Sequence, residues 1–267
     1  MLELLSYPFF RNALLGVLIL SIGAGVMGTY IVTRRMVSIS GGITHASFGG
    51  LGLGYYYGLS PVWTAIVFAV GSAIGVQWLS ARSRVREDSA IAAFWAVGMA
   101  IGVYFVYRNP GNVPELNTFL FGNILTITAA NLWAFGLFTA ALLGFVAARF
   151  RQVEASAFDP DFARVLGLRA GFYNGVMTVF VAIGIVLMIR CVGMMLLMSM
   201  LTLPQLTAET FTSRLRTMIP ASAAISAAGC VGGLLLAART AIPPSAFIVF
   251  IQVGLLAVAA LMRRLFR

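Results

Sequence analysis

Long apolar segments without charged residues place the strongest constraint on how this chain can fold. Of its 267 residues, 60% are apolar and only 10% are charged, whereas soluble domains carry about 25% charged residues. A helix of about 20 apolar residues crosses the roughly 30 Å hydrocarbon layer of a membrane. Because lipid offers no partners for backbone polar groups, helices are favoured. The sequence therefore predicts an all-α polytopic transmembrane bundle, with residues 1–267 as a single domain.

Nine candidate spans follow one another along the chain. The second is rich in glycine and the seventh contains Pro204, so either could be short or broken, and eight crossings remain open if one segment is re-entrant. None shows the polar alternation of a membrane β-strand. The spans are expected at residues 9–33, 41–58, 61–80, 89–107, 130–148, 171–189, 192–208, 218–237 and 245–262.

Arginine alone supplies the positive charge, and its distribution indicates the orientation. With the N-terminus outside, 14 of the 18 arginines fall on the inner side and 4 on the outer side, as expected for a protein of the cytoplasmic or inner membrane. The net charge of +10 is therefore explained by orientation, and we expect membrane lipid rather than nucleic acid as a partner.

Titratable groups are nearly absent from the middle of the predicted spans. All eight acidic residues lie in loops or at span ends, and His45 is the only histidine. Ion-driven carriers usually place ionisable residues at depth, so an external energy source is favoured over a self-contained carrier. The chain has no lysine and hence no Gly-x-x-x-x-Gly-Lys phosphate loop. Any ATP must be hydrolysed by another subunit.

His45 and a group of methionines are the candidates for metal contact. A neutral imidazole at depth could bind a transition metal or simply accept a hydrogen bond. The methionines could form a path for a soft metal, but flexible packing is the favoured interpretation. Neither cysteine has metal-ligand spacing, and no nucleophile–base pair indicates an enzyme. The methionines are Met194, Met195, Met198 and Met200.

Two further features concern packing and the inner loops. Small residues at four-residue spacing, such as Ala46, Gly50 and Gly54, predict close helix packing or a gating segment. The inner connection between the fifth and sixth spans is polar. Within it, Pro160 and Gly167 predict the start and end of a short amphipathic helix. It could lie at the membrane surface or bind a cytoplasmic partner.

Four blocks of sequence resemble the permease subunit of ABC importers for zinc, manganese or iron. The first, 34–46, is similar to Arg-Arg-Met-x-x-x-Gly-Asp-x-Leu-Ser-His-Ala. The second is Glu115 through Leu125, of which residues 119–125 resemble Tyr-Leu-Phe-Gly-x-Ile/Leu-Leu. The third, 158–167, looks like the family's coupling helix. The fourth runs from Val192-Gly193 to Thr207-Ala208 and resembles Val-Gly-x-Leu-Leu…Pro-Ala-x-Thr-Ala.

The resemblance implies a bundle of the type II ABC importer kind that forms a homodimer around a central path. It implies a cytoplasmic ABC ATPase, which holds ATP and Mg²⁺, and an extracytoplasmic metal-binding protein. The chain itself would be a transport subunit without enzymatic activity or bound cofactor. The residues carried over are His45 as a pathway ligand and, as ATPase contacts of a coupling helix over about 158–168, Asp161, Phe162, Ala163, Arg164 and Gly167.

Two departures from the family pattern bear on the substrate. Gly41 stands where the family has an aspartate, one helical turn before His45, and Ala241 stands where it often has another. Losing these carboxylates removes hard oxygen ligands and negative charge that would offset a divalent cation. A permease for a chelated metal or another small solute is therefore the alternative, with a self-contained secondary carrier as a further one.

Overall fold

The computed structural model describes residues 6–82, 85–109, 122–240 and 242–265, and these residues are almost entirely helical. Within them, eight helices have 20 residues or more, and seven helical segments are long and apolar enough to cross a membrane. The long helices are α2 (Pro8–Thr33), α3 (Val37–Tyr57), α4 (Pro61–Arg82), α5 (Glu87–Arg108), α7 (Ala129–Ala148), α10 (Ala170–Met200), α12 (Leu215–Ala237) and α13 (Pro244–Leu265).

The shorter helices connect the long ones. They are the single-turn 3₁₀ helix η1 (Ile124–Thr126), α8 (Phe150–Phe158), α9 (Pro160–Val165) and α11 (Leu203–Glu209). The prediction of a polytopic helical bundle is therefore confirmed, and most predicted spans match a long helix to within a few residues. Helix α8 was not predicted, because its nine residues are too few and too polar for a membrane span and were assigned to the inner connection.

The boundary between the sixth and seventh predicted spans lies close to its expected place. Helix α10 covers Ala170–Met200 as two helical pieces joined at a kink at Gly193, two residues after the expected turn at 190–191. Gly193 has φ 72° and ψ 166°, a region that is essentially open only to glycine. After Met200 the helix breaks, and Pro204 lies in the first turn of α11. The seventh span is therefore broken, as the proline suggested.

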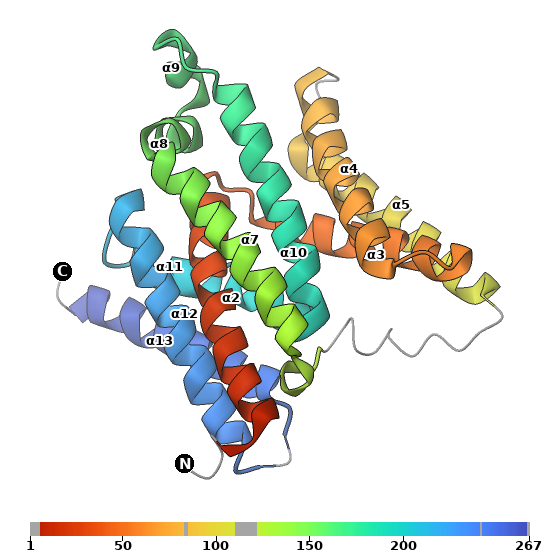
Figure 1. Ribbon diagram of the computed structural model, residues 1–267. Helices are drawn as coiled ribbons and strands as arrows, with labels where there is room; N and C mark the ends of the chain where they lie inside the picture. Colours follow the sequence, from red (N-terminus) through yellow and green to blue (C-terminus); the bar gives the residue numbers. More distant parts are fainter. Residues whose placement is uncertain (1–5, 83–84, 110–121, 241, 266–267) are drawn as a thin grey trace.

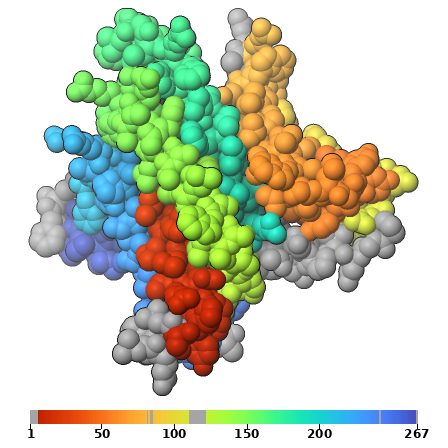
Figure 2. Space-filling model, viewed as in Figure 1, coloured from red at the N-terminus to blue at the C-terminus, as the bar shows by residue number. Residues whose placement is uncertain are grey.

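Figure 1 shows the short helices α8 and α9 at one end of the molecule, far from the N-terminus. The end of α4 and the start of α5 lie toward the same end. In Figure 2, α3 and α4 form a lobe in orange beside the main bundle, which contains α2, α7 and α12. Helix α10 contacts both α4 and α2 and so joins the lobe to the bundle.

Small polar residues hold α2 against α12. The Thr29 and Ser222 hydroxyl oxygens lie 3.1 Å apart, and Ser226 donates to Ser21 at 3.3 Å. At Gly25 a methyl group would lie 2.7 Å from Cβ of Ala223. Helices in lipid commonly associate through such small residues and hydroxyl hydrogen bonds. Helix α2 is therefore closely packed at the centre of the bundle.

Candidate metal path and coupling helix

Helix α3 is held by glycines that bring its backbone against α5. A methyl group at Gly98 of α5 would lie 2.5 Å from Cα of Ala46, and one at Gly52 of α3 would lie 2.6 Å from the Gly102 carbonyl oxygen. Both distances are well inside van der Waals contact, so only glycine permits this approach. The small-residue spacing in the second span therefore does produce close helix packing, and it fixes the position of His45.

His45 lies half-buried on α3 with its ring stacked on Trp95 of α5. The ring centroids are 4.2 Å apart and the planes differ by 6°. Nδ1 of His45 is buried and has no hydrogen-bond partner among the described residues, while Trp95 is 43% exposed. The imidazole is therefore fixed in orientation at a partly open face, with its Nδ1 unbonded to other described protein groups.

Gly41, one turn before His45, faces α10. A methyl group at Gly41 would lie 3.3 Å from Cε and 3.9 Å from Sδ of Met198. The Ser40 hydroxyl also lies 3.6 Å from Sδ of Met198. The space that an aspartate side chain would enter is thus covered by the end of a methionine. Sequence reasoning missed this contact because 157 residues separate Gly41 from Met198.

The described residues offer no carboxylate cluster as a metal site. No group of three or more His, Cys, Asp or Glu side chains lies close enough to hold an ion in this part of the chain. Ala241 and residues 115–121, which are most of the second block, fall outside the described residues. The uncharged groups described at this part of α3 include the His45 imidazole and, beside Gly41, the Met198 sulfur.

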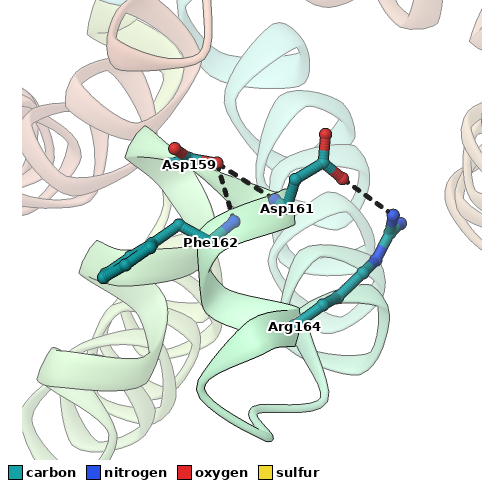
Figure 3. Close-up of polar contacts among 4 residues, drawn as sticks. All are labelled: Asp159, Asp161, Phe162 and Arg164. Atoms are coloured by element: carbon teal, nitrogen blue, oxygen red, sulfur yellow. Dashed lines mark hydrogen bonds and ion pairs between the residues drawn. The ribbon is translucent and has the colours of Figure 1, made fainter.

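The other candidate site is the short helix α9, where Asp159 forms an N-cap (Figure 3). Oδ1 of Asp159 accepts hydrogen bonds from the backbone N–H groups of Asp161 at 3.1 Å and Phe162 at 2.9 Å. Pro160 occupies the first helical position, where no N–H is needed. These contacts satisfy donors that a helix start otherwise leaves free.

Gly167 ends α9 in the left-handed conformation, with φ 75°. The Gly167 N–H donates to the Arg164 carbonyl at 2.9 Å, and the Leu168 N–H donates to the Ala163 carbonyl at 3.0 Å. This pair of bonds is a Schellman motif. The predicted proline start and glycine end are therefore confirmed, and the helix proper covers Pro160–Val165 within the expected region of about 158–168.

The outer face of α9 is both charged and apolar. Arg164 donates to Oδ1 of Asp161 at 2.9 Å in an exposed ion pair, and Figure 3 shows Phe162 on the other side of the helix. Phe162 is 58% exposed and Val165 is 83% exposed, whereas Ala163 is fully buried. Of the predicted contacts, Asp161, Phe162 and Arg164 are thus available to a partner, and Ala163 and Gly167 shape the helix.

A polar chain connects the start of α10 with the end of α2. The Tyr30 hydroxyl donates to Oδ1 of Asn174 at 3.1 Å, and Arg34 donates to the Tyr30 hydroxyl oxygen at 3.2 Å. Asn174 lies one turn into α10, which follows α9 directly. These residues were not predicted, since no local pattern pairs positions 144 residues apart.

Comparisons with known proteins agree with this architecture. The chain is 40% identical over 201 residues to a probable metal transport system membrane protein of Chlamydia pneumoniae, covering 73% of this chain and 69% of that one. It is 29% identical over 260 residues to the manganese transport system membrane protein MntC of Halalkalibacterium halodurans, covering 96% and 88%. A structure of PsaBC from Streptococcus pneumoniae in complex with Fab matches with TM-score 0.86 and 27% identity, covering 97% and 93%.

The model of one family covers nearly the whole chain. Residues 6–263 match the ABC 3 transport family, and the relatives above are named as membrane proteins of metal transport systems. The helical bundle, the position of His45 and the capped helix α9 all lie within the matched range. The chain is a multi-pass membrane permease and belongs to the ABC 3 transport family.

Proposed function

We propose that this chain forms the translocation path of an ATP-driven importer for a divalent transition metal such as zinc, manganese or iron. The observation that carries the proposal is the pairing of an uncharged face around His45 with an exposed, capped helix α9 at the far end of α10. The first could contact a metal ion, and the second could receive a partner. The family and the metal transport names of the relatives support this assignment.

In this proposal, the energy comes from a separate ATPase bound at α9. The chain contains no lysine and therefore no phosphate-binding loop of the Walker type. Phe162, Val165 and the Asp161–Arg164 pair would form the contact, since exposed apolar residues beside charged ones are typical of protein interfaces. A second copy of the permease would complete the path, and an extracytoplasmic protein would deliver the metal.

Movement at α9 would reach His45 through packed helices. Helix α9 leads into α10, and Asn174 of α10 binds Tyr30 near the end of α2. Only three residues separate α2 from α3, the helix that carries His45. Coupling between distant sites needs such a contiguous set of rigid elements. A shift of α9 on nucleotide binding would thus displace α3 relative to α5.

A permease for a chelated metal is the second candidate, and Gly41 favours it. Gly41 lacks the carboxylate that the family has one turn before His45, and the described residues hold no group of three or more His, Cys, Asp or Glu side chains to replace it. A neutral complex would not need that charge. The free ion and a chelate differ in their need for a direct ligand, so the role of His45 separates the two candidates.

Uptake by the complete transporter in proteoliposomes tests the proposal. With ATP inside and metal outside, ATP-dependent uptake of free Zn²⁺ or Mn²⁺ is expected, and His45→Ala should reduce it at least about 10-fold because a metal contact is lost. The ATPase rate serves as the control for assembly. Uptake of a chelate alone, unaffected by His45→Ala, would favour the second candidate. Absence of ATP-dependent uptake for any metal form would contradict both.

A further inference from the structure

The segment of α10 after the bend exposes methionine and little else. Between residues 191 and 200, only Met195 and Met198 are not buried, and Met195 is 44% exposed. They are three residues apart and so share one face of the helix. The other two methionines of the segment, Met194 and Met200, are 7% and 0% exposed. The open face of this segment therefore consists of two thioethers, and the buried methionines serve packing.

This thioether face lies beside the turn of α3 that precedes His45. Met198 covers Gly41 and lies near Ser40, as the distances to its Cε and Sδ atoms show. Gly41 and His45 are four residues apart and hence lie on the same face of α3, about 6 Å from each other. The methionine thus occupies the place of a side chain that would point alongside the His45 ring.

The sulfur of Met198 keeps its lone pairs available. Ser40 has a single hydroxyl proton, and its 2.7 Å bond to the Val37 carbonyl is far stronger than the 3.6 Å contact with sulfur. Thioether sulfur is in any case a weak acceptor of hydrogen bonds. Nothing else that the structure places at this sulfur competes with a metal ion, so Met198 can serve as a ligand.

We propose that Met198, assisted by Met195, is a specificity-determining residue of the metal path. This inference rests on the proposed function and narrows its substrate class. Carboxylate oxygens suit hard cations such as Mn²⁺, whereas imidazole and thioether ligands suit softer ones such as Zn²⁺ and Cu⁺. At position 41 the family's aspartate, a hard ligand, is replaced by glycine, and the Met198 thioether, a soft ligand, lies in the space beside it. The path is therefore selective for borderline and soft transition-metal ions over Mn²⁺.

The test compares uptake of Zn²⁺ and Mn²⁺ by the complete transporter at equal free concentrations. The wild-type protein should favour Zn²⁺. The double variant Met195→Leu, Met198→Leu keeps the side-chain volume but removes both sulfurs, and we expect its Zn²⁺/Mn²⁺ uptake ratio to fall about 10-fold. The matched control is Met200→Leu, a buried methionine of the same segment, which should leave the ratio unchanged.

A second variant adds a hard ligand instead of removing the soft ones. Gly41→Asp restores the carboxylate. Its Cβ alone would require Met198 to shift by a few tenths of an ångström, and the flexible end of Met198 can move further to admit the carboxyl group. This variant should gain Mn²⁺ uptake relative to Zn²⁺. It also tests the inference should the leucine variant fail to assemble with the ATPase.

The outcomes separate this inference from the proposed function. A wild-type preference for Mn²⁺, or a leucine variant with the wild-type ratio, would overturn the role of the thioethers while leaving metal transport intact. Absence of ATP-dependent uptake for both ions would overturn the proposed function together with this inference. An unchanged ratio in Gly41→Asp would likewise show that this turn of α3 does not face the ion.

Discussion

The two regions that hold candidate functional residues are built in opposite ways. Around His45, α3 is held by contacts between residues far apart in sequence, such as Ala46 with Gly98 and Gly41 with Met198. Helix α9 is held by contacts within five residues, from the Asp159 cap to the Gly167 end. The first region depends on the assembled bundle, whereas the second largely specifies itself.

The chemistry of the two regions differs as well. Helix α9 carries charged side chains. Its exposed Asp161 and Arg164 form one of the two ion pairs in the described residues. Around His45, as elsewhere in the described residues, no three His, Cys, Asp or Glu side chains lie close enough together to hold an ion. Charge is costly at membrane depth but cheap at the aqueous end. This difference fits the proposed roles, in which the face around His45 contacts the metal and α9 contacts the ATPase.

A first way to break this comparison is to disturb the long-range region. Gly98→Val would force side-chain atoms into the backbone of Ala46, and we expect the free energy of unfolding to fall by about 3 kcal/mol. Thermal unfolding of the purified protein in detergent measures the change. The substitution should destabilise the lobe formed by α3, α4 and α5 as a whole, because the contact between Gly98 and Ala46 joins α5 to α3.

The matched control for this variant is Gly71→Val in α4. Gly71 is exposed, and a methyl group placed there would meet nothing within 4 Å. Valine has a slightly better helix propensity than glycine, so the unfolding temperature should be unchanged or marginally higher. An equal decrease in the unfolding temperature of the two variants would mean that α3 and α5 do not approach each other as closely as in the structure.

The same contrast explains what the sequence could reveal. Pro160 and Gly167 predicted α9 correctly because capping and termination act through neighbouring residues. The spans were predicted because hydropathy reports on lipid directly. His45 was identified from a motif, but its stacking on Trp95 and the cover of Gly41 by Met198 depend on tertiary packing. The break at Gly193 was placed two residues early, at 190–191, because an apolar helix can turn without any change in composition.

A second prediction concerns the partner surface of α9. Phe162→Ala should weaken binding of the ATPase by about 2 kcal/mol, or about 30-fold in the dissociation constant, if the exposed ring anchors the interface. Thermal stability should remain at the wild-type value, since the ring is 58% exposed and little buried area is lost. Binding can be measured by titrating the purified ATPase onto the permease in detergent.

The control for this variant is Trp133→Ala in α7. Trp133 is also an exposed aromatic residue, at 81%, but it lies near the start of α7, far from α8 and α9 in Figure 1. The variant Trp133→Ala should therefore leave the affinity for the ATPase unchanged. If Phe162→Ala bound the ATPase as tightly as the wild type, α9 would not be the docking element. The proposal that α9 receives the ATPase would then be wrong.

The smallest effect is expected at the Asp159 cap, and it should stay local. Asp159→Ala removes the acceptor for the N–H groups of Asp161 and Phe162 and should cost α9 about 1 kcal/mol. Their amide hydrogens should then exchange about fivefold faster with solvent, while exchange around His45 stays unchanged. Asp159→Asn keeps a side-chain oxygen and should preserve most of the protection. Faster exchange throughout α3 and α5 in the alanine variant would show that α9 and the metal path are one cooperative unit, because α9 packs mainly on α8 and α10 and a loss confined to its cap should not reach the other two helices.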